Sequence, residues 1–345
     1  RDDDAQRVLT GLADDSRVVR PGDLFFARRG SEADGARFAT QAVEAGAVAV
    51  VADRDLVVEA PVLRVDDVDA ALVMAADHFH GTPQADLALI AITGTKGKTT
   101  TAHVIAGALR GAGVRTAVLG TIHHELGDGT AMPAANTTPG ALELRRLLAA
   151  AREAGAQAVV MEVSSHALDQ ARTRGLAFRA AVFTNLASDH LDYHETVEAY
   201  EAAKRRLFED LGADATAIGN AEDTAWPRMR AATQARTLDY GFGDDVALRA
   251  ADVRLSLSST RCLVHFPDGD VRALETHLVG RHNLLNVLAA LGAAEALDVD
   301  RDQALAGAAA VHAIPGRLQR VGDDRELHAF VDYAHTEEAL RQVLG

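Results

Sequence analysis

The sequence is poor in the features that mark secreted, membrane-spanning and nucleic-acid-binding proteins. It has a single cysteine, Cys262, so no disulfide framework is possible, and this fits a reducing compartment. No run of about 18 or more apolar residues occurs, and the chain opens with Arg-Asp-Asp-Asp, the reverse of a secretory signal. We therefore predict a soluble, cytoplasmic protein that has no membrane partner.

Positive charge is also scarce. The 345 residues carry 35 Lys and Arg against 50 Asp and Glu, which gives a formal net charge of −15. A polyphosphate backbone needs a basic face, so this balance argues against a nucleic-acid partner. An anionic substrate would need local positive sites instead. The length and the 48% hydrophobic content allow two domains with sizeable cores, and we expect a monomer.

The clearest motif is the stretch Ile90 to Thr101, which reads Ile-Ala-Ile-Thr-Gly-Thr-Lys-Gly-Lys-Thr-Thr-Thr. An apolar run precedes its glycines and a helical pattern follows them, so it predicts a strand, a glycine loop and a helix. Gly94 and Gly97 would let the backbone approach phosphate oxygens at the helix start. Lys98 would neutralise phosphate charge, and the Thr99 hydroxyl would ligate magnesium. The usual pattern has an earlier glycine that is missing here, so this is a shorter variant, and such a loop can also be a simple turn.

Apolar runs alternate with helical patterns along the chain, which predicts an α/β fold. We expect a small N-terminal α/β domain over residues 1–82, and Gly81-Thr82-Pro83 then reads as a linker. Residues 83–325 indicate a doubly wound, mostly parallel sheet domain that contains the phosphate loop, and the alternation within 246–280 predicts a small antiparallel extension. A further element begins within 326–345. Because the chain starts without methionine and stops soon after that element begins, we expect it to be truncated at both ends.

Polar residues follow two further apolar runs, at the strand ends where ligands bind in doubly wound sheets. Glu162 lies in the run Ala158–Val163, where an unpartnered carboxylate would be costly. Its partner could be a magnesium shared with Thr99, or a core arginine. Asp189-His190-Leu191-Asp192-Tyr193-His194 follows the run Ala180–Leu186. Taken alone, that segment favours a capped helix start, whereas its position favours metal or phosphoryl chemistry.

One lysine falls among apolar residues. Residues 197–211 form a helical pattern in which Lys204 shares a side with Tyr200, Leu207 and Phe208. Spacing alone favours a lysine whose charged end reaches solvent. A lysine held in apolar surroundings can instead lose its proton and be chemically modified.

These motifs belong to a longer ordered set. The set comprises Asp15-Ser16-Arg17, Pro21-Gly22-Asp23-Leu24-Phe25, Gly94-Thr95-Lys96-Gly97-Lys98-Thr99-Thr100, Asn136-Thr137-Thr138-Pro139, Met161-Glu162-Val163-Ser164-Ser165-His166, Thr184-Asn185-Leu186, Asp189-His190-Leu191-Asp192-Tyr193-His194, Tyr200-Glu201-Ala202-Ala203-Lys204, Gly280-Arg281-His282-Asn283, Pro315-Gly316-Arg317 and Asp332-Tyr333-Ala334-His335-Thr336. Together these segments resemble the Mur ligase family of peptidoglycan synthesis, and most of all its member that adds the third peptide residue. The match runs nearly end to end, and the short phosphate loop is the form that this family uses.

The resemblance implies an ATP-dependent amide ligase that phosphorylates a substrate carboxylate and lets an amino group attack the acyl phosphate. The carboxylate would belong to D-glutamate in UDP-N-acetylmuramoyl-L-alanyl-D-glutamate. The amino group would come from diaminopimelate, lysine or ornithine, and the sequence does not show which. The family's third domain, which chooses that amino acid, would lie outside this chain.

The resemblance also implies roles for residues by position. Those that would hold ATP are Gly94, Thr95, Lys96, Gly97, Lys98, Thr99, Thr100, Asn283, Arg317 and Asp332, with His335 nearby. Magnesium would be held by Thr99, Glu162, His190 and a carbamylated Lys204, and the catalytic set would be Lys98, Glu162, His190 and Lys204. The uridine end of the substrate would meet Ser16, Ser31, Glu32 and Ala33, and the muramoyl-peptide part would meet Thr137, Thr138, Ser164, Gln170 and Arg172.

The match has departures that leave the named catalytic side chains in place. Ser188 stands where an arginine or glycine often precedes the Asp-His pair, Asp14 replaces an apolar residue, and Thr336-Glu337-Glu338 lacks the usual proline. Two alternatives stay open. One is a ligase of the same fold for another substrate, as in folylpolyglutamate or cyanophycin synthetases. The other is a non-catalytic nucleotide-binding module.

Overall fold

The computed structural model describes residues 8–30, 33–321, 329–334 and 340–341. The chain divides into two compact units. One consists of Arg1–Ala85 with Gly140–Ala149, and the other of Asp86–Pro139 with Ala150–Gly345. The limits predicted from the sequence for the domains stay a prediction.

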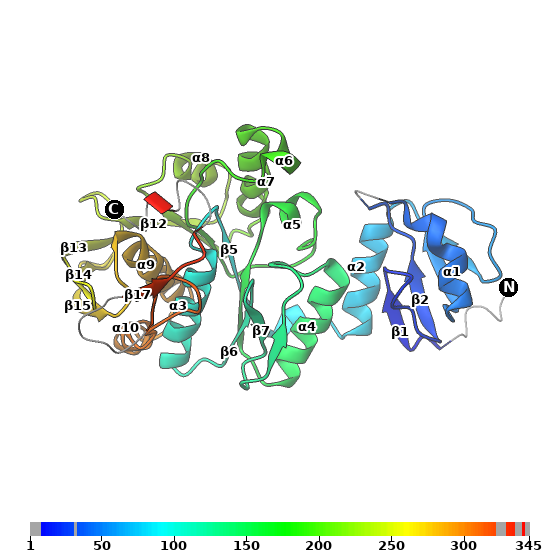
Figure 1. Cartoon of the computed structure of the whole chain (residues 1–345), viewed down its shortest axis with the longest axis horizontal. Coiled ribbons are helices and arrows are strands. Elements are labelled where there is room, and N and C mark those ends of the chain that lie inside the picture. Colours follow the sequence, from blue (N-terminus) through cyan, green and yellow to red (C-terminus); the bar gives the residue numbers. More distant parts are fainter. Residues whose placement is uncertain (1–7, 31–32, 322–328, 335–339, 342–345) are drawn as a thin grey trace. The chain divides into compact units, whose positions relative to one another are not determined.

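The first unit is a four-stranded parallel sheet in the order β1-β2-β3-β4, with α1 and α2 on opposite faces (Figure 1). Alternate strand residues serve the two faces: Phe25 and Val50 pack with α1, and Leu24 and Val51 pack with α2. The small α/β unit expected at the N-terminus is therefore confirmed. Its elements are β1 Gly11–Ala13, β2 Asp23–Phe26, the 3-10 helix η2 Gly35–Phe38, α1 Ala39–Glu44, β3 Ala49–Ala52, β4 Val62–Arg64, α2 Val68–Phe79 and the 3-10 helix η3 Pro83–Asp86, which ends at the first residue of the second unit.

Helix α4, Ala141–Glu153, contributes its first turns to this unit. Ala141 belongs to the cluster under α2, and Arg145 donates from Nε to Asp77 Oδ1 at 3.1 Å. The Arg145 side chain is fully buried, and burial lowers the pKa of its guanidinium while Asp77 opposes that shift. A buried cation needs such a partner, so this pair fixes α4 against α2.

The second unit is built on one eleven-stranded sheet in the order β15-β14-β13-β12-β11-β10-β5-β9-β6-β7-β8. The strands from β13 to β6 are parallel, and an antiparallel hairpin extends the sheet at each edge. Its strands are β5 Ala88–Thr93, β6 Thr116–Leu119, β7 His123–Glu125, β8 Ala131–Pro133, β9 Ala158–Glu162, β10 Ala180–Phe183, β11 Thr216–Asn220, β12 Arg236–Gly241, β13 Leu248–Leu255, β14 Thr260–His265 and β15 Val271–Thr276. The mostly parallel sheet and its extension over 246–280 are confirmed.

Helices cover both faces of this sheet, as a doubly wound fold requires. Val182 and Ile218 belong to the large core that includes α3, α9 and α10, whereas the ring of Phe183 contacts Phe208 on α7 and Trp226 on α8. The helices are α3 Lys98–Gly111, α5 Ser165–Asp169, α6 Leu191–His194, α7 Val197–Glu209, α8 Trp226–Ala231, α9 Arg281–Ala296 and α10 Arg301–Ala309. None of the helices in the described part of the chain is both long and apolar enough to span a membrane.

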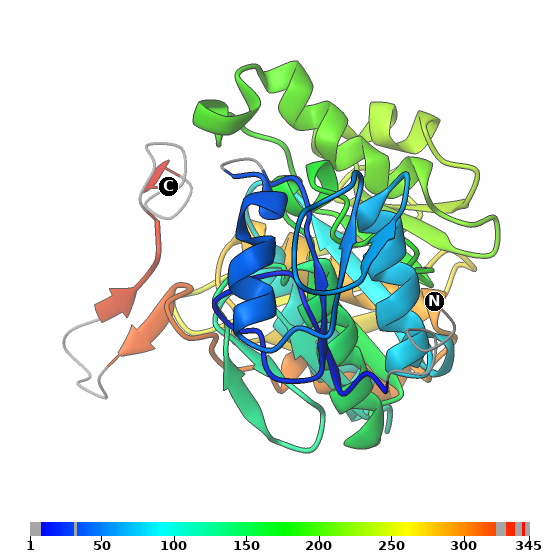
Figure 2. The same cartoon turned by 90° about the vertical axis from the view of Figure 1, so that its right-hand side faces the viewer.

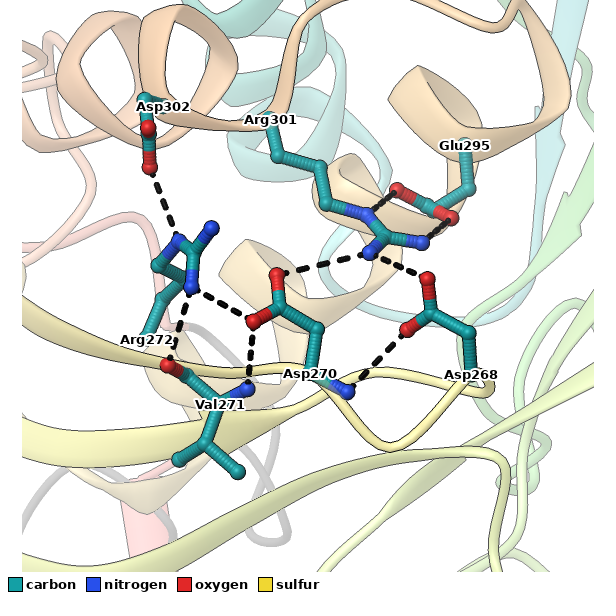
Figure 3. Close-up of polar contacts among 7 residues, drawn as sticks. All are labelled: Asp268, Asp270, Val271, Arg272, Glu295, Arg301 and Asp302. Atoms are coloured by element: carbon teal, nitrogen blue, oxygen red, sulfur yellow. Dashed lines mark hydrogen bonds and ion pairs between the residues drawn. The ribbon is translucent and has the colours of Figure 1, made fainter.

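The antiparallel extension is joined to the helices by an ion-pair cluster (Figure 3). Arg301 at the start of α10 meets both carboxylate oxygens of Glu295 on α9, at 2.7 and 2.8 Å, and reaches Asp268 in the β14–β15 turn at 2.7 Å. Arg272 on β15 bonds Asp270 at 2.5 Å and Asp302 at 3.0 Å. The cluster therefore ties the outer hairpin to two helices.

Several short strands were not expected from the sequence. They include β11 and β12, and the shortest of them are β1, the β7–β8 hairpin, and the pair β16 Gln319–Val321 and β17 Ala329–Val331, which forms a separate two-stranded sheet (orange to red in Figure 2). Each of these shortest strands has only three residues, so a period-two pattern has little room to show.

Candidate nucleotide-binding site

The glycine loop lies between β5 and α3, as predicted. Gly94 and Gly97 have φ values of 147° and 85°, which side-chain-bearing residues rarely adopt. A Cβ on Gly94 would lie 2.0 Å from Thr184 Oγ1, and one on Gly97 would lie 2.6 Å from Asn286 Oδ1. Only glycine fits at either position, so the two glycines let the loop pass close to its neighbours.

The loop is braced by the segment that follows β10, the strand beside β5. Asn185 accepts from the backbone N–H of Thr95 at 2.9 Å through its carbonyl oxygen, and from the N–H of Lys96 at 2.9 Å through Oδ1. Its Nδ2 donates back to Lys96 O at 3.0 Å. Those two loop amides are thus engaged, and the donors left for phosphate are the first-turn amides of α3, which have no intrahelical acceptor.

The chain has three lysines, and all of them lie at this loop: Lys96, Lys98 and Lys204. Lys98 Nζ donates to Gly94 O at 2.9 Å and to Thr95 O at 3.0 Å, and removal from water lowers the pKa of its ammonium. Lys96 pairs with Asp189 at 3.1 Å. Burial would raise the pKa of Asp189, but the hydrogen bond and the charge of Lys96 outweigh it and lower that pKa.

Glu162 ends β9, which flanks β5 on the side opposite β10. Its side chain is 2% exposed, and neutral groups hold it. Thr99 Oγ1 donates to Oε2 at 3.0 Å, while Thr121 donates from N to Oε1 at 2.9 Å and from Oγ1 to Oε2 at 3.1 Å. Within the described residues no cation pairs with this carboxylate, so the alternative of a core glutamate paired with an arginine is wrong.

The groups around Glu162 fit a magnesium ion. Hydroxyl and carboxylate oxygens are the hard ligands that Mg²⁺ prefers, and Mg²⁺ usually keeps several waters or phosphate oxygens as well. Across residues 8–30, 33–321, 329–334 and 340–341, no three His, Cys, Asp or Glu side chains gather as a metal-binding group. Thr99 and Glu162 would therefore supply only part of the coordination, and their metal-binding role stays a prediction.

Lys204 and His190 both lie beside the Tyr200 ring, and His190 also lines the cavity that Glu162 lines. Lys204 Nζ donates to Gly94 O at 3.0 Å and lies 4.3 Å from the centre of the Tyr200 ring. At 1% exposure this amine does not reach solvent, so the alternative drawn from its spacing is wrong. Burial, and then the charge of Lys98, hold the pKa of Lys204 well below its ordinary value.

His190 precedes the four-residue helix α6 with a φ of 53°, and no side chain caps that helix. The favoured alternative is therefore right that a helix starts at this segment and wrong that a side chain caps it. The His190 ring lies 6.2 Å from Tyr200 and 4.9 Å from His166, between ring centres. Tyr200 in turn bonds Thr95 of the loop at 3.1 Å, and burial raises the pKa of Tyr200 to about 12.

A cavity of about 340 Å³ opens over the loop. The three ATP-binding residues predicted outside the loop line it together with the loop: Asn283, Arg317 and Asp332. Arg317 Nη2 lies 3.5 Å from Thr99 Oγ1, and its guanidinium lies 4.9 Å from the centre of the Tyr333 ring. His335 lies outside the described residues.

The residues predicted to meet the muramoyl-peptide form one hydrogen-bonded group in the second unit. Thr138 Oγ1 donates to Glu162 O at 2.9 Å and accepts from Ser164 N at 3.0 Å. Arg172 donates to Thr138 O at 2.7 Å and twice to Gln170 Oε1, at 3.0 and 2.7 Å. Thr137 lines the cavity beside Glu162.

The residues predicted for the uridine end belong to the first unit. Ser16 Oγ donates to Gln41 Oε1 at 3.1 Å, and Ala33 is exposed. Ser31 and Glu32 lie outside the described residues. The binding role of this set stays a prediction.

Three contributors were missed from the sequence. Asn185 and Tyr200 stand in motifs that the sequence displays, but nothing in their chemistry marks them as braces of the loop. Thr121 follows an apolar run in Gly120-Thr121, which reads as an ordinary turn. Only the pairing of β6 with β9, with Leu119 opposite Met161, shows that Thr121 reaches Glu162.

The phosphate loop lies at the carboxyl end of a central strand. One neighbouring strand supplies a buried carboxylate, and a segment after the other neighbouring strand braces the loop. These features define a nucleotide-binding protein of the phosphate-loop class. Family models extend this: residues 92–294 match the Mur ligase middle domain, and residues 8–80 match the model described as Mur ligase family, catalytic domain. The chain belongs to the Mur ligase family, which confirms the resemblance seen in the sequence.

Individual relatives agree. The chain is 42% identical over 344 residues to a UDP-N-acetylmuramoyl-L-alanyl-D-glutamate--2,6-diaminopimelate ligase of Geobacter metallireducens, covering 97% of this chain and 67% of that protein. A protein of the same name from Listeria monocytogenes serotype 4b is 38% identical, with 97% and 69% covered. A solved structure of a ligase so named superposes with a TM-score of 0.81 at 32% identity, covering 97% and 69%. A folylpolyglutamate synthase of Mycobacterium tuberculosis shares the fold. It is 20% identical and superposes with a TM-score of 0.64, covering 79% of this chain and 69% of that one.

Proposed function

We propose that this chain binds ATP and a UDP-muramoyl dipeptide for an ATP-dependent amide ligase. The enzyme adds the third amino acid to UDP-N-acetylmuramoyl-L-alanyl-D-glutamate. The observation that carries this proposal is the shared cavity, which is lined by Thr137 of the muramoyl-peptide set, by Thr99 of the phosphate loop and by Glu162. The names of the relatives support 2,6-diaminopimelate as the incoming amino acid.

The chemistry requires a carboxylate oxygen to attack the terminal phosphorus of ATP, with ADP leaving. An amine then attacks the acyl carbon, a proton is lost, and inorganic phosphate leaves. This chain's part is to hold charge in place: the α3 amides and Lys98 bind phosphate oxygens, and Arg317 adds a cation beside Thr99. Magnesium, held by Thr99 and Glu162, would neutralise charge that develops on the phosphoryl oxygens.

Lys204 carries a second part of the proposal, a carbamate formed on its amine. Only a neutral amine attacks CO₂, and burial lowers the pKa of Lys204, which favours the neutral form of its amine. The bond formed joins Nζ to the carbon of CO₂, and one proton is released. The resulting anion would lie beside Lys98 and, with His190 on the same tyrosine, Tyr200, would help to hold a second magnesium.

The carbamate is tested with ¹³C-bicarbonate. The chain has three lysines, so the expected result is a single ¹³C carbamate resonance. If this resonance disappears in Lys204→Arg and persists in Lys96→Arg, the carbamate is assigned to Lys204. No resonance in the wild-type protein, or one that survives Lys204→Arg, would refute this part.

The ligase proposal is tested by trapping the acyl phosphate. The protein is incubated with ATP, Mg²⁺, hydroxylamine and UDP-N-acetylmuramoyl-L-alanyl-D-glutamate, and the hydroxamate of the glutamyl carboxylate is expected. Lys98→Met serves as the control and should give none. A hydroxamate with folate substrates alone would favour the same-fold alternative, and none with any acid would favour a non-catalytic nucleotide-binding module.

A further inference from the structure

Thr121 contacts both the carboxylate of Glu162 and Thr137, a residue predicted to meet the muramoyl-peptide. Its N and Oγ1 donate to Glu162, and its Oγ1 lies 3.1 Å from Thr137 Oγ1. We propose that Thr121 is a positioning residue: it fixes the carboxylate of Glu162 for magnesium and couples it to Thr137. This inference rests on the magnesium site within the proposed function.

The main chain brings Thr121 to this place. Strand β6 pairs in parallel with β9, so the residues after Leu119 lie beside Glu162 at the same edge of the sheet. Gly120 makes room for the carboxylate, because a Cβ there would lie 2.4 Å from Glu162 Oε1. Gly120 and Thr121 thus form a cradle in which one residue leaves space and the next donates two hydrogen bonds.

Counting protons gives the direction of each bond. An ionised carboxylate only accepts, so the single hydroxyl proton of Thr121 is committed to Glu162 Oε2. Thr137 must then donate its own proton to Thr121 Oγ1. The result is a directed chain from Thr137 through Thr121 to Glu162, and Oε1 is separately held by the backbone N–H of Thr121.

This arrangement has a consequence for metal binding. Oε1 accepts from the backbone N–H of Thr121 and Oε2 accepts from the hydroxyls of Thr99 and Thr121, so donors orient both oxygens of the carboxylate that would face a cation. Hydrogen bonds that orient a metal ligand typically contribute about 10- to 100-fold in metal affinity. Thr121 is exposed at the rim of the cavity, so its hydroxyl can be removed with little disturbance to the core.

The experiment measures Mn²⁺ binding to the ADP complex by electron paramagnetic resonance, with no acid substrate present. Thr121→Val should weaken Mn²⁺ binding by about 10- to 100-fold, and Thr121→Ser, which restores the hydroxyl, should stay within about threefold of wild type. Gly120→Ala should displace the carboxylate and weaken Mn²⁺ binding to a similar extent. ADP affinity in EDTA and the melting temperature should be unchanged in Thr121→Val. Thr237→Val on β12, outside the cavity, is the matched control.

Coupling to Thr137 is read in the same assay with the UDP-muramoyl dipeptide added. Thr137→Val should abolish the tightening of Mn²⁺ binding that the dipeptide causes in the wild-type protein. The inference is overturned if Thr121→Val binds Mn²⁺ like wild type, if Thr121→Ser loses as much as Thr121→Val, or if the wild-type ADP complex binds no Mn²⁺. A failed hydroxamate trap with normal Mn²⁺ results would instead refute the ligase proposal alone.

Discussion

At the scale of single residues, the position of lysine sets the chemistry of the site. The remaining 32 of the 35 basic residues are arginines, whose guanidinium stays charged under all ordinary conditions, whereas the three lysines at the loop can give up a proton. Lys98 and Lys204 both donate to Gly94 O, so two lysine side chains crowd around one carbonyl. Phosphate oxygens would relieve this crowding by giving Lys98 an anionic acceptor.

Replacing Lys98 therefore has a defined expected cost. A hydrogen bond to a charged group contributes about 1.5–3 kcal/mol, so Lys98→Met should weaken ADP binding by about 10- to 100-fold. Isothermal titration calorimetry without metal measures this. Arg205→Met on the exposed side of α7 is the control and should leave ADP affinity unchanged. Equal affinity for ADP in Lys98→Met and wild type would contradict the role.

His103, one turn into α3, predicts a pH dependence of stability. Burial, with a smaller contribution from His123, lowers the pKa of His103 to about 4 from 6.5. Between these values the unfolded chain binds a proton that the folded chain does not, so stability falls as pH falls from 6.5 towards 4. The upper limit for the loss of unfolding free energy is about 3 kcal/mol, and we expect a smaller loss because the ring is partly exposed.

The variant His103→Gln removes this contribution. Urea unfolding at pH 7.5 and pH 5.0 should show a smaller difference between the two pH values in the variant than in wild type. Parallel losses of stability in both proteins would contradict the lowered pKa.

The sequence predicts those site residues whose chemistry and position agree. Glu162 and His190 follow apolar runs, and parallel strands bring their carboxyl ends to one edge, so the grouping could be inferred. Thr121 and Asn185 could not, because a threonine and an asparagine after a strand are ordinary turn residues. Their roles depend on strand register and on hydrogen bonds across more than 40 positions in the chain.

At the scale of elements, the helix that carries the phosphate loop is held by a close helix–helix contact. A Cβ on Gly307 of α10 would lie 2.3 Å from Gly107 O and 2.9 Å from the Cα of Gly111, both on α3. Alanine normally favours a helix over glycine by about 1 kcal/mol, but overpacking against a rigid backbone costs about 1–3 kcal/mol. The cost of overpacking should exceed the gain in helix propensity here, because both neighbours are main-chain atoms that cannot move aside easily.

Gly307→Ala is therefore expected to destabilise the protein, as measured by urea unfolding, and to weaken ADP binding because α3 shifts. Gly212→Ala is the matched control, since a Cβ there meets nothing within 4 Å. A Gly307→Ala protein as stable as wild type would show that α10 can move away from α3 at no cost.

The ion-pair cluster of Figure 3 gives a second prediction at this scale. Arg301 contacts Glu295 and Asp268 from different elements, and these hydrogen bonds raise the pKa of its guanidinium. Its side chain is 25% exposed, so each pair contributes less than about 1 kcal/mol. Arg301→Met should lower the free energy of unfolding by about 1 kcal/mol or slightly more at low salt, and by less at 1 M NaCl. Arg205→Met breaks one exposed pair and should lower the free energy of unfolding by under about 0.5 kcal/mol. A loss independent of salt would point to packing of the side chain rather than charge.

Elements with long apolar runs were predictable and short polar ones were not. The pattern from Leu87 to Ile92 marks β5 because a central strand is buried on both faces. The edge strands β7 and β8, His123–Glu125 and Ala131–Pro133, carry no such run, because an edge hairpin needs little apolar surface. Their pairing is set by the strand that they extend, which is a tertiary effect.

At the scale of the whole molecule, the first unit is not contiguous in sequence. It takes Gly140–Ala149 from the far side of the phosphate-loop segment. Glycine and proline in the sequence indicate a domain boundary near Gly81-Thr82-Pro83. No pattern in the sequence indicates that a helix beyond this boundary packs with the unit before it. The assignment follows from two contacts: Ala141 in the cluster under α2, and Arg145 against Asp77.

This arrangement predicts the behaviour of fragments. A fragment of residues 1–85 would lose Ala141 and Leu142 from its core and would leave Asp77 without the Arg145 guanidinium. Breaking a buried ion pair by removing one partner costs about 3–5 kcal/mol, and a unit of this size has a total stability of only about 4–13 kcal/mol. The fragment should therefore unfold at a lower urea concentration than one in which residues 140–153 are joined to it by a glycine-serine linker, as followed by circular dichroism. Introducing Arg145→Met into the joined fragment should remove much of the gain, and equal midpoints for all three proteins would show that α4 contributes nothing to the stability of the first unit.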